Sequence, residues 1–443
     1  SGKILRPRFA IPATGSFTST RKWRISCWPD SMRPVSTLLR WVLLLYVLSF
    51  AMCWEKRVEK AGENASPPPT QQQASTQDNA TGGGLVGEPP ASAPKRAAGR
   101  APFLTELRQL KGIEGRVTDV AFSPDGAWLA AGTSKGVELF EVSTGKLLGS
   151  APLEARAIQF TSDGKDLIAV TMESNLTGFH IPFPPGTGPG PASPAALIPI
   201  PQIDDLKQAD VSCIAVKPGK PEIAVAIRGT SPAIRFLDTG AWKITAVAHI
   251  ESLPEDSGFA PQSVAFSPDS EYLVLDGLML DEAKDYDAYF AVWADGGRRF
   301  VQMKKLNGYL GQVFANTLLF YSPREGDFRN QQVVVASHRG RSDGYVALFQ
   351  FFRLSDFTLM NEFDDTDVYG VYGIPSTVAG KNRIVGVHWD TDYLYIWDTA
   401  KAGATEWVSV PVPLLEAIAI SPDRKTIATA HKEGIVILWK VRQ

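Results

Sequence analysis

The sequence predicts an all-β fold made of repeated four-stranded sheets. Residues 117–142, VTDVAFSPDGAWLAAGTSKGVELFEV, contain three short runs of β-branched, aromatic and small apolar residues, which suit a pleated, half-buried surface. The SPDG motif at 123–126 separates the first two runs and supplies Pro and Gly where a tight turn needs a preset or positive φ. Similar units recur about every 40–55 residues up to the C-terminus, and a period of this length is typical of arrays of four-stranded sheets.

Composition and charge narrow the function classes. The chain has 443 residues, of which 44% are hydrophobic and 21% charged, enough for one large or two medium globular domains. Residues 1–100 hold 14 Lys and Arg against 6 Asp and Glu, whereas residues 101–443 hold 31 against 41. The repeat region is therefore acidic, which argues against binding to nucleic acid, because neutralising phosphates needs a positive surface. Of the three cysteines only Cys213 lies in the repeat region, so no disulfide is expected within it.

The first 102 residues divide into three segments. Residues 1–31 are basic and do not begin with Met; they are either an over-extended gene start, with Met32 as the initiator, or an acid-poor leader. Residues 32–53 contain an uncharged run of 13 residues at 41–53, which is short for a bilayer span and typical of a secretory signal. Residues 54–102 are rich in Pro, Gly, Gln and Ser, which predicts a disordered linker.

The apolar run predicts export of the repeat region, by one of three routes. The small-x-small sequence at 49–51 is a candidate cleavage site, which makes residues 32–53 a cleaved signal peptide. Cys53 is a candidate for lipidation, although Met52 stands where a lipoprotein signal has a small residue. In the third route the run stays as an uncleaved signal anchor. Contact with a membrane is expected only through this segment or its lipid, and a cytoplasmic protein with a chance apolar run is the alternative.

From residue 103 to residue 443, seven repeats are expected, each opened by an innermost strand. These strands are predicted at residues 117–122, 157–160, 211–216, 262–266, 316–321, 368–374 and 416–420. A second strand follows each turn, and the third strand often carries an aromatic residue near its end. These aromatic residues are Phe140, Phe236, Trp293, Phe349, Trp397 and Trp439.

Several motifs resemble those of the WD-repeat β-propeller family. FSPDG at 122–126, FSPD at 266–269 and ISPD at 420–423 resemble the family's turn after the first strand, and LYIWD at 394–398 and VILWK at 436–440 resemble its closing strand. The resemblance covers residues 103–443 and implies a seven-bladed β-propeller that binds other proteins. No Gly-His dipeptide precedes a repeat, and Lys135 and Glu433 stand where the family has a turn Asp. The hydrogen-bonded tetrad that the family builds from those residues is therefore expected to be mostly absent.

Residues 103–110, FLTELRQL, are expected to close the propeller. The chain ends four residues after Trp439, so the seventh unit lacks an outermost strand, and residues 103–110 are a run of strand length that precedes the first unit. We expect this run to pair with the strand at 435–440, which would join the two ends and remove exposed sheet edges.

Acidic residues gather in the loops expected on one face, where each outer strand leads into the next blade and each second strand into the third. They are Asp204, Asp205, Asp210, Glu251, Glu255, Asp256, Asp281, Glu282, Asp285, Asp287, Asp364, Asp365 and Asp367. The opposite face mixes acids with bases. A one-sided negative field would speed encounter with a protein that has a basic surface and would weaken with salt. Simple solvation of loop acids is the alternative, and a calcium site at the last three is a third interpretation.

Three histidines are expected at one place, the end of the second strand in the fifth, sixth and seventh units. They are His338, His388 and His431. Either this place suits a mid-sized polar residue, or the three form an arc of groups whose charge changes between about pH 5 and 8 and modulates partner binding. On the second interpretation they belong to the predicted partner-binding face.

The motifs of the sequence do not predict a catalytic or cofactor-binding function. The sequence has no phosphate-binding Gly loop, no Cys-x-x-Cys-His haem site and no His-Glu-x-x-His zinc pattern. It therefore predicts an exported, membrane-tethered interaction scaffold, without a cofactor or a metal, rather than an enzyme. The alternatives are a propeller enzyme, either a lactonase-like hydrolase or a quinone-dependent dehydrogenase, and a carbohydrate-binding envelope protein.

Overall fold

The computed structural model divides the chain into two compact units, Ser1–Gly83 and Gly84–Gln443, and all the elements below lie in the second. The structure describes residues 103–182, 195–200, 203–207, 209–229, 231–250, 253, 258–280, 286–306, 313–321, 332–341, 344–369, 376–379, 383–387, 393–399, 404–410 and 415–442. Within these ranges, no helix has the length and apolar character needed to cross a membrane.

The described strands form seven sheets, which are antiparallel except where one short strand is added in parallel. The first contains β2 (Val117–Phe122), β3 (Trp128–Thr133), β4 (Val137–Glu141), β5 (Leu147–Ala151) and β9 (Ala195–Ala196). The second contains β6 (Ala155–Phe160), β7 (Asp166–Thr171), β8 (Leu176–His180) and β10 (Ile198–Pro199). The third contains β11 (Asp210–Val216), β12 (Glu222–Arg228), β13 (Ala233–Asp238) and β14 (Lys243–His249).

The other four sheets follow in chain order. The fourth contains β15 (Ala260–Phe266), β16 (Leu273–Leu280), β17 (Tyr286–Ala294) and β18 (Arg299–Lys305). The fifth contains β19 (Val313–Tyr321), β20 (Gln332–Arg341), β21 (Gly344–Arg353) and β22 (Leu359–Tyr369), and the sixth β23 (Ser376–Ala379), β24 (Arg383–Val387), β25 (Tyr393–Asp398) and β26 (Ala404–Ser409). The seventh contains β27 (Leu415–Ile420), β28 (Thr426–His431), β29 (Ile435–Val441) and β1 (Leu104–Leu110). Among the described connections, two contain a short 3₁₀ helix: η1 (Asp204–Leu206) and η2 (Asp295–Gly297).

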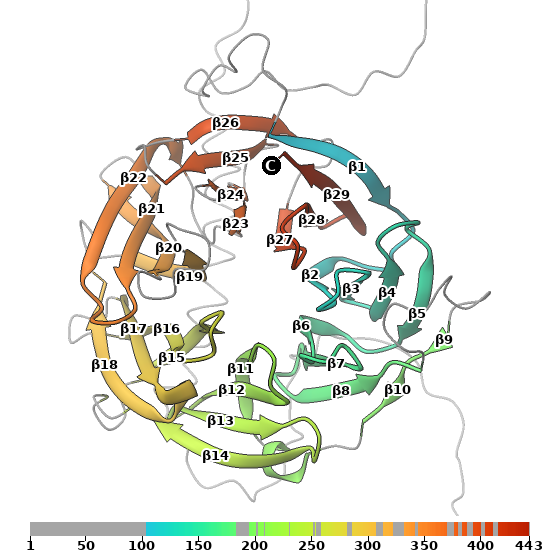
Figure 1. Cartoon of the computed structure of the whole chain (residues 1–443), viewed down its shortest axis with the longest axis horizontal. Coiled ribbons are helices and arrows are strands. Elements are labelled where there is room, and N and C mark those ends of the chain that lie inside the picture. Colours follow the sequence, from blue (N-terminus) through green and yellow to red (C-terminus); the bar gives the residue numbers. More distant parts are fainter. Residues whose placement is uncertain are drawn as a thin grey trace, which may run out of the picture. The chain divides into compact units, whose positions relative to one another are not determined.

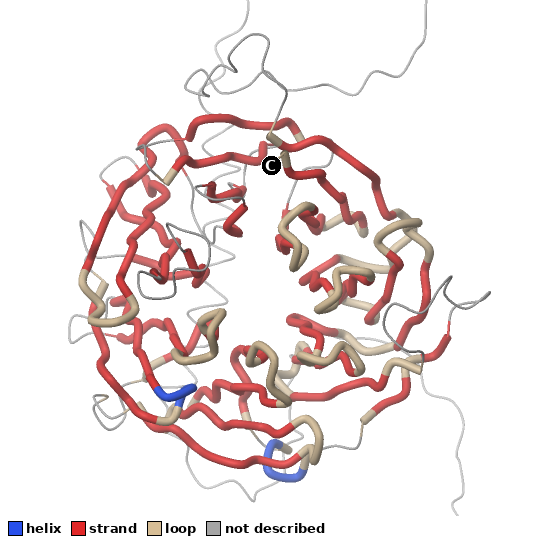
Figure 2. Tube along the Cα trace, in the orientation of Figure 1, coloured by secondary structure: helices blue, strands red, loops and turns tan. Residues whose placement is uncertain are grey.

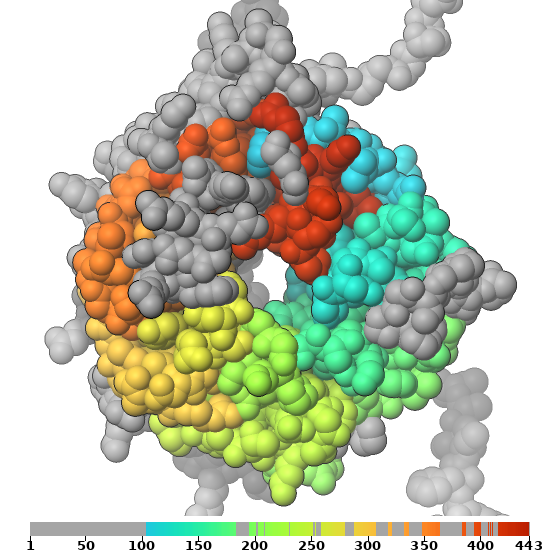
Figure 3. Space-filling view, in the orientation of Figure 1, coloured from blue at the N-terminus to red at the C-terminus, as the bar shows by residue number. Residues whose placement is uncertain are grey.

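The sheets are arranged around a centre, with the first strand of each sheet innermost (Figures 1 and 2). Each innermost strand contacts the innermost strand of the next sheet, and β27 contacts β2. The space-filling view shows an opening at the centre of this arrangement (Figure 3). The fold is therefore an all-β propeller, as the sequence predicts.

Four turns between first and second strands share one hydrogen-bonding pattern. In the first sheet, Ser123 Oγ donates to Asp125 Oδ1 at 2.6 Å and accepts from the Trp128 amide at 2.9 Å, while Gly126 has a φ of 73°. Ser267 with Asp269, Ser421 with Asp423, and Thr161 with Asp163 repeat the hydroxyl-to-carboxylate bond. The sequence motif identifies three of these turns. It misses Thr161 because the Pro is replaced by Ser162.

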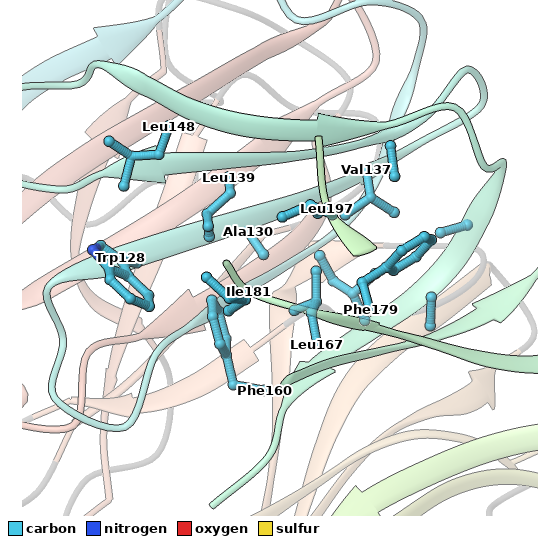
Figure 4. Close-up of a cluster of buried hydrophobic side chains, with 14 residues drawn as sticks. Trp128, Ala130, Val137, Leu139, Leu148, Phe160, Leu167, Phe179, Ile181 and Leu197 are labelled. Carbon is cyan, nitrogen blue, oxygen red and sulfur yellow. The ribbon is translucent and has the colours of Figure 1, made fainter. Parts of the chain in front are cut away.

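Neighbouring sheets pack through their apolar faces. Between the first and second sheets, Trp128 and Leu139 lie in one buried cluster with Phe160, Leu167 and Phe179 (Figure 4). Equivalent clusters lie between the second and third, third and fourth, fourth and fifth, sixth and seventh, and seventh and first sheets. The third-strand aromatic residues contribute to this packing, and those nearly or fully enclosed are Phe236, Trp293, Phe349, Trp397 and Trp439. Such rings remove large apolar areas from water, which is the dominant favourable contribution to folding.

Most predicted innermost strands are present, but the sixth is wrong. Residues 368–374 were expected to open the sixth repeat, whereas β22 of the fifth sheet continues to Tyr369 and the innermost strand of the sixth sheet is β23. The reason is pairing: β21 is long enough to hold β22 along its length, and Val346 is still paired with Tyr369. Asp364, Asp365 and Asp367 consequently lie in an outer strand and not in the predicted loop.

The N-terminal strand β1 pairs with β29, as the sequence predicts. The register runs from Leu104 opposite Val441 to Leu110 opposite Val436, with one irregularity between Glu106 and Arg108. Two further bonds hold the start of β1. The Phe103 amide donates to Glu406 Oε1 of the sixth sheet at 2.6 Å, and the Phe103 carbonyl accepts from the Arg442 amide at 2.8 Å.

Deleting residues 103–112 should lower the thermal midpoint by more than about 5 °C, because β29 would lose its outer partner and the buried side chains Leu104 and Leu110 would be missing. Differential scanning calorimetry measures this. Deleting ten residues from 70–79 is the matched control and should leave the midpoint unchanged. Equal midpoints for both deletions would contradict the role assigned to β1.

Candidate interaction face

The connections divide between two faces of the propeller because strands alternate in direction. We use the name entry face for the face at which each innermost strand begins. The connections from second to third strands lie on the same face. Near this face, six of the described innermost strands contain one residue that has no partner opposite it in the second strand. These bulge residues are Thr118, Arg156, Ser212, Gln262, Asn316 and Glu416. A β-bulge turns the extra side chain out of the ladder, so it can make a contact elsewhere.

The bulge residues of the first two sheets bond to the next sheet. The single hydroxyl proton of Thr118 lies between two acceptors, with Oγ1 at 2.5 Å from the carbonyl oxygen of Ala155 in the second sheet and at 2.9 Å from that of Gly132 in β3. Arg156 Nη2 donates to the carbonyl of Val211. In both cases the acceptor is the residue just before the bulge in the next innermost strand. The pKa of Arg156 is lowered by burial and by the nearby charge of Arg228.

Bulge residues also reach the next sheet at two other interfaces, once by the same kind of bond and once by an ion pair. Ser212 Oγ, in a buried side chain, donates to the carbonyl of Pro261 in the fourth sheet. Glu416 of the seventh sheet forms an ion pair with Arg116, directly before β2, with 2.5 Å between Oε2 and Nη2. Side chains at four bulges thus connect successive sheets at the inner rim, three of them through a backbone carbonyl and one through an ion pair.

A second layer of bonds lies one to three residues further along the innermost strands. Asp119 Oδ2 accepts from the Ile158 amide of the second sheet at 2.8 Å, and Oδ1 accepts from the amide of the following residue. Gln159 forms two hydrogen bonds with the third sheet: its Nε2 donates to the Ile214 carbonyl at 3.2 Å, and its Oε1 accepts from the Val216 amide at 3.0 Å. Burial raises the pKa of Asp119 to about 7, although the two amide donors oppose the shift.

Basic side chains lie among the described acids of the entry face. Asp204 pairs with Lys207 at 2.5 Å, which lowers the pKa of Asp204, and Asp210 lies 3.6 Å from Arg228. The carbonyl of Asp205 accepts a bond from Arg235. The carboxylates of Asp204 and Asp210 are therefore each paired with a cation, whereas Arg235 contacts the backbone of Asp205.

Most other predicted acids cannot be placed. Glu251, Glu255, Asp256, Asp281, Glu282 and Asp285 lie outside the described residues, as do His388 and Cys53. Asp287 is the second residue of β17, opposite Met279.

Of the three predicted histidines, the structure describes the side-chain environment of His431. His431 ends β28 as predicted but is fully buried, so its place on an exposed partner-binding face is wrong. Its Nε2 lies 3.0 Å from Thr429 Oγ1, which accepts from Trp439 Nε1 at 2.9 Å. This Trp–Thr–His chain ties the second strand of the seventh sheet to the third. His338 lies within β20, opposite Phe314 and Ala347, three residues before the strand ends.

The described residues offer little for covalent or metal chemistry. No group of three or more His, Cys, Asp and Glu in the described ranges could hold a metal ion. Burial raises the pKa of the Cys213 thiol, which keeps it in its less reactive protonated form. GTSKG at 132–136 has the spacing of a nucleophile elbow, which requires a turn from strand to helix, but here it joins β3 to β4.

Replacing Ser212 by Ala should lower the free energy of unfolding by about 1–2 kcal/mol, because a buried carbonyl loses its donor. Thr118→Val should have a similar effect at the first interface, whereas Thr118→Ser keeps the hydroxyl and should cost much less. Urea titrations of the three variants give the comparison. A Thr118→Val variant as stable as Thr118→Ser would show that the bond between sheets contributes nothing.

Comparison with known families identifies one repeat. Residues 104–140 match the family model described as WD domain, G-beta repeat. The match begins with β1 of the seventh sheet and continues through β2, β3 and most of β4 of the first. Comparison with curated proteins finds none that matches the chain. Over residues 104–140 the chain is similar to a WD repeat, and the described sheets have the arrangement of a β-propeller.

Proposed function

We propose that the chain is an exported, membrane-tethered scaffold for protein–protein interaction, built on one closed ring of seven blades. The observation that carries the proposal is the WD-repeat match, because propellers with such repeats generally bind other proteins. The match also crosses from the outer strand of the seventh sheet to the first sheet, as a repeat does when the N-terminal strand closes the ring.

The contacts among the innermost strands support the closed ring. β2, β6, β11, β15, β19, β23 and β27 follow one another around the ring in contact. With β1 as the outer strand of the seventh sheet, no sheet of this ring is left without a neighbour on either face. Closure of this kind covers the faces that an open array would expose.

We place the partner on the entry face and expect it to have a basic surface. Bulge bonds fix the backbone where the entry-face loops begin, and loops held by a rigid scaffold are the usual place for binding residues. The acids near the fourth sheet supply the negative charge, since Asp204 and Asp210 near the third sheet are paired with cations. The acidic balance of residues 101–443 supports a protein and not a nucleic acid as the partner.

Replacing Asp281, Glu282, Asp285 and Asp287 by Asn or Gln should slow association with the partner several-fold at low salt, because long-range attraction sets the encounter rate. The partner is first recovered by pull-down from native membranes, and association is then followed by stopped flow. As a matched control, Asp238, Glu271, Asp295 and Asp356, near turns of the opposite face, are neutralised in the same way. Association that responds to neither set nor to ionic strength would remove the electrostatic proposal.

Export is proposed from the apolar run at 41–53 and the low-complexity segment after it. The mature protein should begin at Met52 or Cys53, and intact mass spectrometry of the native protein determines this directly. An added diacylglyceryl mass would assign a lipid to Cys53. A species that retains residues 32–51 would contradict cleavage and leave the signal anchor.

A further inference from the structure

Two carboxylates, in different sheets, occupy the same position in the strand register: the pair of opposite residues directly after the bulge. In the first sheet, Asp119 of β2 is opposite Gly132 of β3, and in the fourth, Ser263 of β15 is opposite Asp276 of β16. Asp119 and Ser263 each come directly after the bulge residue. Because opposite residues of an antiparallel pair project to the same side, both carboxylates face the interface with the following sheet.

Asp276 has fewer hydrogen-bond partners than Asp119. Its side chain is fully buried, and its Oδ1 accepts from the Ser263 amide at 2.8 Å. Among the described residues, no donor reaches its Oδ2. Val274 and Phe290, on the same side of the sheet, belong to the apolar cluster that packs against the fifth sheet. A charge on Asp276 would therefore be enclosed between the fourth and fifth sheets with one donor only.

The described groups around Asp276 are mostly neutral. β15 presents Ser263, β17 presents Phe290, and β19 of the fifth sheet presents Leu318. On β18, Lys304 is opposite Phe290, which places it two strands, or about 10 Å, from Asp276. The Lys304 ammonium lies 5.1 Å from the centroid of the Phe352 ring, so it already has a partner in the fifth sheet.

The third sheet contributes one titratable group near Asp276, and one cation from the second sheet and one from the third lie beyond it. The negative charge of Asp276 helps to raise the pKa of Cys213 on β11. Arg156 and Arg228 also act on Cys213, but Arg156 donates to the Val211 carbonyl and Arg228 pairs with Asp210. No described cation makes an ion pair with Asp276.

We propose that Asp276 is a pH-dependent switch at the interface between the fourth and fifth sheets. Its neutral acid form is compatible with close packing of the two sheets, whereas its ionised form weakens this packing near the innermost strands. Burial raises the pKa of Asp276 from 3.8 to about 8. Below about pH 4 the group is neutral in the folded and the unfolded chain. Between pH 4 and 8 only the unfolded chain ionises, so the free energy of unfolding falls as pH rises. Above pH 8 the folded chain carries a buried charge.

Hydrogen exchange of the full-length protein tests the switch. The peptide that covers β19 should exchange roughly tenfold faster at pH 8.5 than at pH 6.5, after correction for the intrinsic pH dependence of exchange. In Asp276→Asn, which cannot ionise, the corrected rates should be equal at the two pH values. The thermal midpoint of this variant relative to the unmodified chain should rise steadily from pH 5 to pH 8.

Asp423→Asn is a control variant whose stability relative to the unmodified chain should change with pH in the opposite direction. Hydrogen bonding to Ser421 lowers the pKa of Asp423, so this variant should lose stability relative to the unmodified chain as pH rises from about 3 to 5. Asp276→Ser, smaller and also uncharged, gives the same test if the Asn variant does not fold. Equal acceleration of β19 exchange in the unmodified chain and in an uncharged variant would overturn the proposal, as would no acceleration in either.

Discussion

The pairing of β1 with β29 is the interaction on which the rest of the propeller depends. Each sheet buries two faces against its neighbours, and a linear array would leave the first and last faces open to water. Here the outer strand of the seventh sheet comes from residues that precede the first sheet, so hydrogen bonds between Leu104–Leu110 and Ile435–Val441 join the first described strand to the last. The pairing joins residues more than 300 positions apart. The seventh sheet therefore forms only when both ends are present, and contacts of such high sequence separation form slowly.

The interfaces between sheets are layered from the centre outward. At the inner rim, polar side chains at bulges bond to the backbone of the next sheet, as Thr118, Arg156 and Ser212 do. One row further along are Asp119 and Asp276, and beyond them the contacts are apolar clusters. Apolar packing supplies most of the stability but is non-directional, whereas the polar rim specifies how each sheet is set against the next.

Local patterns in the sequence were sufficient to predict the hairpins and the pairing of β1 with β29, but not features that depend on register. The turn motifs located first strands because Ser-Pro-Asp sets the turn through its own side chains. Residues 368–374 have the composition of a strand, yet β22 of the fifth sheet extends to Tyr369 because β21 provides a long partner, and the innermost strand of the sixth sheet begins at Ser376. The positions of the bulges and the burial of Asp276 depend on which residues face each other across strands. A register shift of one residue would move every side chain of a strand to the other face of the sheet. The strand position of His431 was predictable; its burial was not, because it results from packing between sheets.

A disulfide between β1 and β29 tests ring closure most directly. Thr105 and Lys440 are opposite each other in the register, so Thr105→Cys with Lys440→Cys should form a disulfide within one chain on mild oxidation. Peptide mapping distinguishes it from bonds to Cys27, Cys53 and Cys213, and non-reducing electrophoresis distinguishes a cross-linked monomer from a dimer that exchanges strands. Thr105→Cys with Lys432→Cys is the control, because Lys432 lies beyond the far end of the pairing. A disulfide in the first pair of a monomer, and none in the second, is the predicted result. Failure of the first pair to form it, or its formation only between two chains, would contradict a ring closed by its own N-terminal strand.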